Sequence, residues 1–250
     1  MNSSKIARLR TILRKMGRVV VAYSGGVDSA FLLKIASEEL GPDVLAVIAS
    51  SETYPGKETR DAERLARKLK VRFETIHTSE LDNPEFRRNP PRRCYHCKKE
   101  LWGEMLKVAR REGISTVVDG QNLDDEDDFR PGAQASREMG IRSPLKEAGW
   151  GKDEIRAYSR KLGLPTWNKP HDFIQTCSGI GVMRRHADQV DLESLEKILP
   201  GITAKVHIVE APILEISSKQ IRQRIEESMG YRYYLRDAVY QAITEMGMYK

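Results

Sequence analysis

The feature that most constrains the fold is a short apolar run that passes through a glycine-rich turn directly into a helix. Residues 19–22 (VVVA) predict a buried strand, residues 24–29 (SGGVDS) a turn, and residues 28–40 a helix. Glycines permit the positive φ of such a turn and let backbone N–H groups approach an oxyanion, while the helix N-terminus adds partial positive charge. The segment therefore predicts a phosphate site at the end of a strand. It is not a Walker A loop, because no lysine closes it.

Short apolar runs and helical stretches alternate along the chain. The predicted strands are 19–22, 44–49, 73–76, 116–118 and 206–209, and the predicted helices are 1–17, 28–40, 57–69, 98–112, 152–162, 219–227 and 235–246. Repeated strand–helix–strand units indicate an α/β, Rossmann-like fold with a parallel sheet, helices on both faces and right-handed crossovers. Ligands of such sheets bind at the carboxyl ends of the strands.

The composition excludes a disordered or membrane-spanning chain. Of 250 residues, 40% are hydrophobic and 31% charged, and no apolar run approaches the roughly 20 residues of a bilayer span. The formal charge of +6 suits a phosphate-rich ligand. Residues 171–250 hold 10 Lys and Arg against 11 Asp and Glu, so the positive excess lies in residues 1–170. The N-terminal helix lacks the features of a signal peptide, which predicts a cytoplasmic protein.

Three cysteines are present, and Cys94 and Cys97 have C-x-x-C spacing within residues 81–97, a stretch with three prolines that predicts a long loop. In a cytosolic chain this spacing indicates metal, redox or sulfur chemistry, since disulfides are rare there. A structural or zinc-binding pair is the alternative, with His96 or His171 as a further ligand. A second loop, residues 119–132, is acidic: Asp119, Asp124 and Asp125 are candidates to bind Mg²⁺ or orient a nucleotide, whereas residues 126–128 suit a solvated loop.

The motif S-G-G-x-D-S resembles the PP-loop ATP pyrophosphatases, of the adenine nucleotide alpha hydrolase fold, which cleave ATP between its α and β phosphates. The resemblance implies that the turn holds the triphosphate with Mg²⁺. It also implies that a carboxylate or amide is activated as an adenylate, which nitrogen or sulfur then attacks.

Six further motifs resemble the LarE family of PP-loop sulfur transferases, over about residues 5–170: residues 83–86 (NPEF), 89–101 (NPPRRCYHCKKEL), 119–125 (DGQNLDD), 130–132 (RPG), 142–145 (RSPL) and 164–170 (LPTWNKP). This resemblance implies adenylation of pyridinium-3,5-biscarboxylic acid mononucleotide, release of pyrophosphate, and insertion of sulfur with loss of AMP. The residues predicted to bind ATP and Mg²⁺ are Ser24, Gly25, Gly26, Asp28, Ser29, Ser50, Asp119, Gly120, Asp124 and Arg130.

The same resemblance implies two possible sulfur sources. Some members sacrifice the sulfur of one cysteine and keep dehydroalanine, whereas others carry three cysteines that are associated with a [4Fe-4S] cluster, whose open iron would hold an extra sulfide. The predicted catalytic and cluster-binding residues here are Cys94, Cys97 and Cys177. The family's third cysteine falls at Ile174, so Cys177 is either a displaced ligand or a small buried residue.

Residues 171–250 are predicted to form a separate small α/β segment that resembles the end of NadD, the nicotinate-nucleotide adenylyltransferase. Ser217 and Ser218 open a helix, and Ser218 and Arg222 are candidates to bind phosphate at its start, the alternative being a plain capped helix. No H-x-G-H segment is present, so this tail alone is not expected to transfer nucleotides.

Two other functions stay open at this stage. One is thiolation of tRNA, against which no RNA-binding appendage or aromatic-rich basic stretch is evident. The other is a non-catalytic nucleotide-binding module or a fusion related to nicotinate-nucleotide adenylyltransferase. The predicted partner is a nicotinate-derived nucleotide; a nucleic acid or a membrane is not expected, and a homo-oligomer is possible.

Overall fold

The computed structural model describes residues 2–51, 56–79, 82, 84–87, 92–125, 131–183, 190–209 and 217–249. The chain divides into two compact units, Met1–Trp167 and Asn168–Lys250. Each unit is described by itself.

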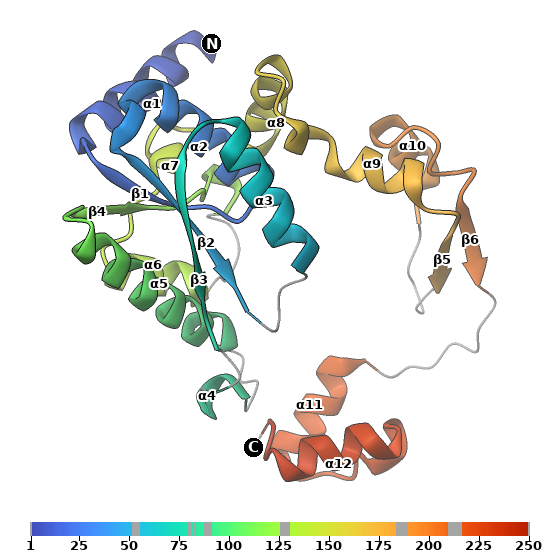
Figure 1. Ribbon diagram of the computed structural model, residues 1–250. Helices are drawn as coiled ribbons and strands as arrows, with labels where there is room; N and C mark the ends of the chain where they lie inside the picture. The colour runs from blue at the N-terminus through green and yellow to red at the C-terminus, as the bar shows by residue number, and fades with distance from the viewer. Residues whose placement is uncertain are drawn as a thin grey trace. The chain divides into compact units, whose positions relative to one another are not determined.

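The first unit is built on a four-stranded parallel sheet (Figure 1). Its strands are β1 (Val19–Ala22), β2 (Val44–Ser50), β3 (Arg72–His77) and β4 (Thr116–Val118), in the order β3-β2-β1-β4. In register, Val21 of β1 lies between Ala46 of β2 and Val118 of β4. The prediction of a parallel sheet is confirmed. Strands β1 and β4 have the expected bounds, and β2 and β3 are slightly longer.

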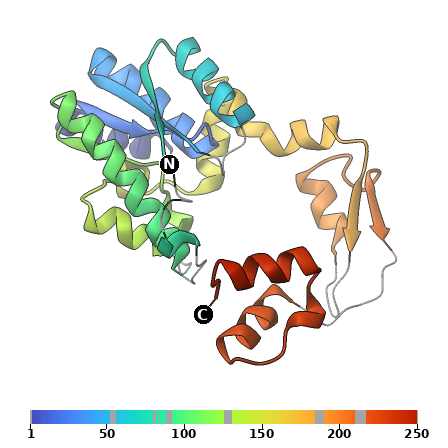
Figure 2. The same cartoon turned by 60° about the horizontal axis from the view of Figure 1, so that its bottom comes forward.

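Helices cover both faces of this sheet, as predicted (Figure 1, Figure 2). One face carries α1 (Asn2–Met16), α2 (Val27–Leu40), α3 (Gly56–Lys68), α7 (Pro144–Glu147) and α8 (Lys152–Lys161); the other carries α5 (Arg93–Arg111) and α6 (Pro131–Glu138). Val19 and Val21 of β1 belong to the first core and Val20 to the second, as the two-residue period of a strand dictates. Both faces of the sheet are therefore buried, which explains the uninterrupted apolar runs.

The strand order reverses between β1 and β4. From β1 the chain proceeds outward through β2 to β3, and it then returns past both strands to place β4 on the other side of β1. In open α/β sheets a crevice forms at this point, outside the carboxyl ends of the two strands. Ser24 and Asp119, which follow β1 and β4 closely, are thereby brought to the same edge of the sheet.

The cysteine segment differs from its prediction. A short helix, α4 (Pro84–Arg87), lies within it, and α5 begins at Arg93, so Cys94 and Cys97 lie on a helix and the prediction of a loop through residue 97 is wrong. Tyr95 packs against the second core, and α6, which the sequence did not predict, contacts these first turns. A partner helix distant in sequence thus supplies the packing that the local pattern lacks.

The second unit contains a two-stranded parallel sheet of β5 (Ile180–Met183) and β6 (Val206–Val209), with α10 (Leu192–Ile198) between them in sequence. Its described residues also form the helices α9 (Lys169–Thr176), α11 (Ser218–Glu226) and α12 (Asp237–Glu245). Strand β6 and helices α11 and α12 match their predictions closely, whereas β5, α9 and α10 were not predicted. Single 3₁₀ turns occur at Gly41–Asp43, Leu123–Asp125, Pro165–Asn168 and Arg232–Tyr234.

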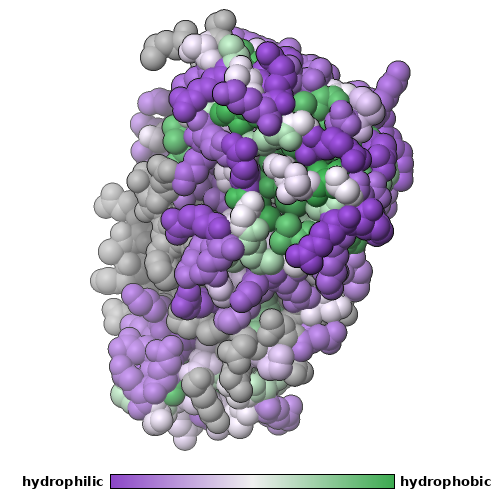
Figure 3. All heavy atoms as spheres, turned by 90° about the vertical axis from the view of Figure 1, so that its left-hand side faces the viewer, coloured by the Kyte–Doolittle hydropathy of each residue, from purple (hydrophilic) through white to green (hydrophobic). Residues whose placement is uncertain are grey.

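On the face drawn in Figure 3, hydrophilic side chains dominate and hydrophobic ones appear between them. This agrees with a mean hydropathy of −0.53. Within the described ranges, none of the helices combines the length and the apolar character that crossing a membrane requires.

Candidate functional site

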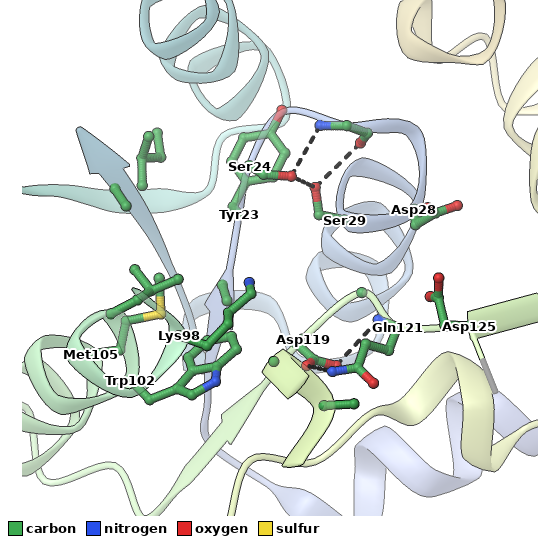
Figure 4. A pocket seen from close by; sticks show the side chains of 18 of the residues that line it. Tyr23, Ser24, Asp28, Ser29, Lys98, Trp102, Met105, Asp119, Gln121 and Asp125 are labelled. Carbon is green, nitrogen blue, oxygen red and sulfur yellow. Dashed lines mark hydrogen bonds between the residues drawn. The ribbon is translucent and has the colours of Figure 1, made fainter. Parts of the chain in front are cut away.

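A cavity of about 800 Å³ lies in the first unit at the carboxyl ends of β1, β2 and β4 (Figure 4). Its volume suits a nucleotide-sized ligand. Eight residues predicted from the sequence line it together: Ser24, Gly26, Asp28, Ser29, Cys94, Asp119, Gly120 and Asp125. Of the other predicted residues, Gly25, Ser50, Asp124 and Cys97 are not among its lining, and Arg130 lies outside the described residues.

The turn after β1 is held by its own hydroxyls. The Ser24 hydroxyl accepts a hydrogen bond from the Gly26 N–H (3.4 Å) and lies 3.1 Å from the Ser29 hydroxyl, which donates to the Gly26 carbonyl (3.2 Å). Gly25 has a φ of +71°, and a Cβ there would lie 3.0 Å from Cβ of Ala62. Among the described residues, no side chain caps the N-terminus of α2. Its first N–H groups are thus available to an anion at this turn.

Asp28 has one paired and one unpaired carboxylate oxygen. Its Oδ2 forms an ion pair with Nζ of Lys152, which comes from the start of α8. Its Oδ1 is buried and has no hydrogen-bond partner among the described residues. A buried carboxylate oxygen without a hydrogen-bond partner is available to bind a ligand. Mg²⁺ prefers oxygen ligands such as carboxylates. Asp124 contributes indirectly, because it accepts a hydrogen bond from the Lys152 backbone N–H (2.6 Å).

The segment after β4 packs directly on the start of α2. A Cβ on Gly120 would lie 2.9 Å from the backbone nitrogen of Ser29, so only glycine allows this approach. Asp119 is 5% exposed and accepts hydrogen bonds from Ser143 Oγ (2.7 Å) and Gln121 Nε2 (2.8 Å). Burial raises the pKa of the Asp119 carboxyl, while these hydrogen bonds act in the opposite direction.

Helix α5 supplies the opposite wall of the cavity. Cys94, Lys98, Leu101, Trp102 and Met105 line it at helical spacing. Nζ of Lys98 lies 4.8 Å from the centre of the Trp102 ring, a cation–π contact. Sequence analysis identified Cys94 here and missed the others. The available signal was the spacing of Lys98, one helical turn after Cys94.

Tyr23, the residue before the turn, was also missed. Its side chain is 1% exposed, lines the cavity, and has a hydroxyl without a partner in the part of the chain that the structure describes. Burial raises the pKa of this phenol well above its usual value, so the hydroxyl keeps its proton and stays a hydrogen-bond donor.

The three cysteines lie in two units. Cys94 is exposed and Cys97 half-buried on α5, while Cys177 follows α9 in the second unit and donates its N–H to the Phe173 carbonyl (2.9 Å) and its thiol to the Ile174 carbonyl (3.5 Å). None forms a disulfide. Among the residues described, no group of three or more His, Cys, Asp or Glu side chains is placed to hold a metal.

Known proteins share this architecture. A family profile described as NAD synthase matches residues 4–89. The structure of NMN synthetase from Francisella tularensis superposes with a TM-score of 0.51 at 13% identity, over 98% of this chain and 92% of that one. At this identity the likeness establishes the fold alone.

Sequence relatives decide the family. An uncharacterized protein of Synechocystis is 35% identical over 92% of this chain and 81% of its own length. The pyridinium-3,5-bisthiocarboxylic acid mononucleotide synthase of Lactiplantibacillus plantarum, a LarE protein, is 31% identical over 94% of this chain and 91% of its own length. The chain belongs to the LarE family of PP-loop sulfur transferases.

This relation to LarE extends further than the sequence motifs indicated. An alignment over 94% of 250 residues cannot end at residue 170, so the expected limit of the resemblance there is too narrow. The C-terminal part also matches adenylyltransferases, as predicted. A probable nicotinate-nucleotide adenylyltransferase of Dehalococcoides mccartyi is 30% identical over 38% of this chain and 47% of its own length.

Proposed function

We propose that this LarE-family protein adenylates a carboxylate of pyridinium-3,5-biscarboxylic acid mononucleotide and replaces a carboxylate oxygen with sulfur. The observation that supports this most directly is the cavity, in which the turn after β1, the unpaired oxygen of Asp28 and the thiol-bearing Cys94 meet. The printed name of the L. plantarum relative, a bisthiocarboxylic acid mononucleotide synthase, supports the choice of substrate.

In the first step, a carboxylate oxygen of the substrate attacks the α-phosphorus of ATP, and the bond to the bridging oxygen breaks to release pyrophosphate. The N-terminus of α2 and the turn at Gly26 stabilise the negative charge on this leaving group. Lys152 brings a cation to the same edge. In the second step, a sulfur nucleophile attacks the acyl carbon of the adenylate, and AMP leaves with the oxygen.

The residues present fit a magnesium ion. Asp28 offers a buried carboxylate oxygen with no protein partner among the described residues, and it lies in the first turn of α2, at the end of the turn proposed to bind phosphate. Asp28 would be the protein ligand of this ion, since Mg²⁺ prefers oxygen ligands. Bound there, Mg²⁺ neutralises charge on the triphosphate.

Cys94 is the proposed sulfur-handling residue, because it is exposed to the cavity at the first turn of α5. Cys94 and Cys97 belong to the first unit and Cys177 to the second, so a [4Fe-4S] cluster on all three cysteines would take ligands from both units. Iron and acid-labile sulfide in anaerobically purified protein, both lost in C177A, would establish it. Their absence, with dehydroalanine at residue 94 after one turnover, would establish a sacrificial thiol.

The decisive experiment is anaerobic incubation with ATP, Mg²⁺ and the biscarboxylate mononucleotide. We expect AMP and pyrophosphate, together with the mass gain of oxygen-to-sulfur exchange in the substrate. D28N should abolish both products. Formation of ADP instead of AMP would contradict the proposal. Thiolation of added bulk tRNA would indicate the RNA-modifying function, and nucleotide binding without AMP would indicate a non-catalytic module.

A further inference from the structure

We propose that Ser136 of α6 is a positioning residue that fixes the helix carrying Cys94 relative to Asp119 across the cavity. The inference rests on the proposed sulfur transfer and adds to it a residue that does not itself line the cavity. It follows from three hydrogen bonds of one buried hydroxyl.

The Ser136 hydroxyl uses its whole hydrogen-bonding capacity. It accepts from Nε1 of Trp102 (3.0 Å) and from Nε2 of Gln121 (3.2 Å), and it donates to the carbonyl of Gly132 (3.3 Å). A hydroxyl has one donor and two acceptor positions, so none is left over. Ser136 is only 2% exposed, which excludes bulk water as a substitute partner.

One of these bonds leads to Asp119. Gln121 donates from Nε2 to Asp119 Oδ2 (2.8 Å) as well as to Ser136, and its backbone N–H donates to Asp119 Oδ1 (3.2 Å), as Figure 4 shows for the pair. The Asp119 carboxylate can only accept, so the amide nitrogen of Gln121 must face it. Ser136 thus holds the side chain that orients the Asp119 carboxylate.

Of the other two bonds, the one to Trp102 leads to α5 and the one to Gly132 stays within α6. Trp102 forms part of the cavity wall, beneath Lys98. A Cβ on Gly132 would lie 3.0 Å from Cγ of Lys98 and 3.5 Å from the Cys94 carbonyl oxygen, so α6 touches α5 at the turn that bears both residues. Ser136 thus bonds α5 directly through Trp102, and its bond to the Gly132 carbonyl lies within α6, at the residue where α6 touches the turn of Cys94 and Lys98.

Loss of the hydroxyl would leave the buried indole N–H of Trp102 and one N–H of the half-buried Gln121 amide without their acceptor. Either α5 or the segment after β4 must then move to find another partner. The turn after β1 has no bond to Ser136 among those the structure gives, so nucleotide binding there should persist. The expected defect is in the approach of sulfur to the adenylate.

The test is S136A beside the matched control S159A. Ser159 lies on α8, is 0% exposed, and its Oγ has no partner in the described residues, so its removal deletes an equally buried hydroxyl without breaking a bond. For S136A we expect kcat for sulfur insertion to fall about a hundredfold, since displacements near 1 Å cost this much. The KM for ATP should stay within about twofold of wild type. S159A should match wild type in both.

A second measurement, by NMR, tests the positioning role without any enzyme activity. The chain has three tryptophans, and in ¹⁵N-labelled protein the indole N–H resonance of Trp102, assigned with W102F, should shift in S136A and stay in place in S159A. A kcat for S136A equal to that of S159A would overturn the inference. If the wild-type protein releases no AMP, the proposed function fails, and an unshifted Trp102 resonance would then refute the positioning role separately.

Discussion

Lys152, the first residue of α8, pairs its ammonium with one carboxylate oxygen of Asp28 in the first turn of α2. The other oxygen of Asp28 is buried without a partner among the described residues. The pair joins residues 124 positions apart and brings a cation to the anion-binding turn. An acidic residue next to a phosphate site would otherwise repel the ligand, so Lys152 offsets the charge of Asp28 until a cation binds.

Replacement of Lys152 by methionine should weaken ATP binding by about tenfold to a hundredfold, because a hydrogen bond to a charged group contributes about 1.5–3 kcal/mol. The control is K5M. Lys5 makes a comparable ion pair with Glu154 of the same helix (2.6 Å), but neither residue lines the cavity. Titration calorimetry with a non-hydrolysable ATP analogue measures the nucleotide affinity of both variants. Equal affinities for K152M and K5M would contradict a role for Lys152 in nucleotide binding.

Gly25 should not tolerate a side chain. Its φ of +71° costs an L-residue about 1–2 kcal/mol, and the added Cβ would meet Ala62 at 3.0 Å. G25A should therefore lower the free energy of unfolding by about that amount and displace the turn that binds phosphate. In G103A, by contrast, the new methyl lies in the middle of α5 with no atom within 4 Å. Alanine there should stabilise the helix by up to about 1 kcal/mol. Urea denaturation should show opposite signs for the two variants.

The glycine-rich turn after β1 and the parallel sheet were predictable because their signals are local. Residues 19–29 carry the strand, the turn and the helix start in one continuous stretch, and the valines of β1 are apolar on both faces because both faces are covered. Lys152 was not predictable in this way. Its contact with Asp28 depends on how α8 packs against α2, and nothing in the residues around Lys152 specifies that packing.

The titration of Asp119 should make the free energy of unfolding fall as pH rises. Burial raises its pKa in the folded protein, so between the ordinary aspartate pKa of about 3.9 and the raised value the folded state binds more protons than the unfolded state. The free energy of unfolding therefore decreases as pH rises through this window and levels off above it. D119N should remove this decrease.

Glu154 provides the control of opposite sign. Its hydrogen bond with Lys5 lowers its pKa, so its contribution to stability is present above the ordinary glutamate pKa and is lost as pH falls. In wild type, Glu154 makes the free energy of unfolding rise with pH, and E154Q should remove this rise. D119N should instead remove the decrease that Asp119 causes. Denaturation curves at a series of pH values compare the variants. A D119N profile parallel to wild type would show that Asp119 does not titrate in this range.

The first turns of α5, which carry Cys94 and Cys97, could not be predicted from local sequence patterns. Residues 81–97 contain prolines and little apolar periodicity, which favours a loop, yet α5 begins at Arg93 because α6 packs against its first turns. The contact depends on Gly132, which approaches the Cys94 carbonyl and the Lys98 side chain closely. The Ser136 hydroxyl bonds the Gly132 carbonyl, and such a hydrogen bond produces no periodic pattern in the sequence. Sequence therefore predicted Cys94 as a site residue but not the helix that positions it.

Ser217 should stabilise the second unit through its helix cap and not through a ligand. Its hydroxyl accepts from the Gln220 N–H (3.1 Å), and Gln220 Oε1 accepts in turn from the Ser217 N–H (2.9 Å), which completes a capping box at the start of α11. S217A should lower stability by about 1 kcal/mol. S218A changes an exposed first-turn residue outside the box and should leave stability within about 0.5 kcal/mol of wild type. Thermal melts with and without inorganic phosphate compare the two variants. Phosphate stabilisation of wild type that disappears in S218A would instead assign phosphate binding to this helix start.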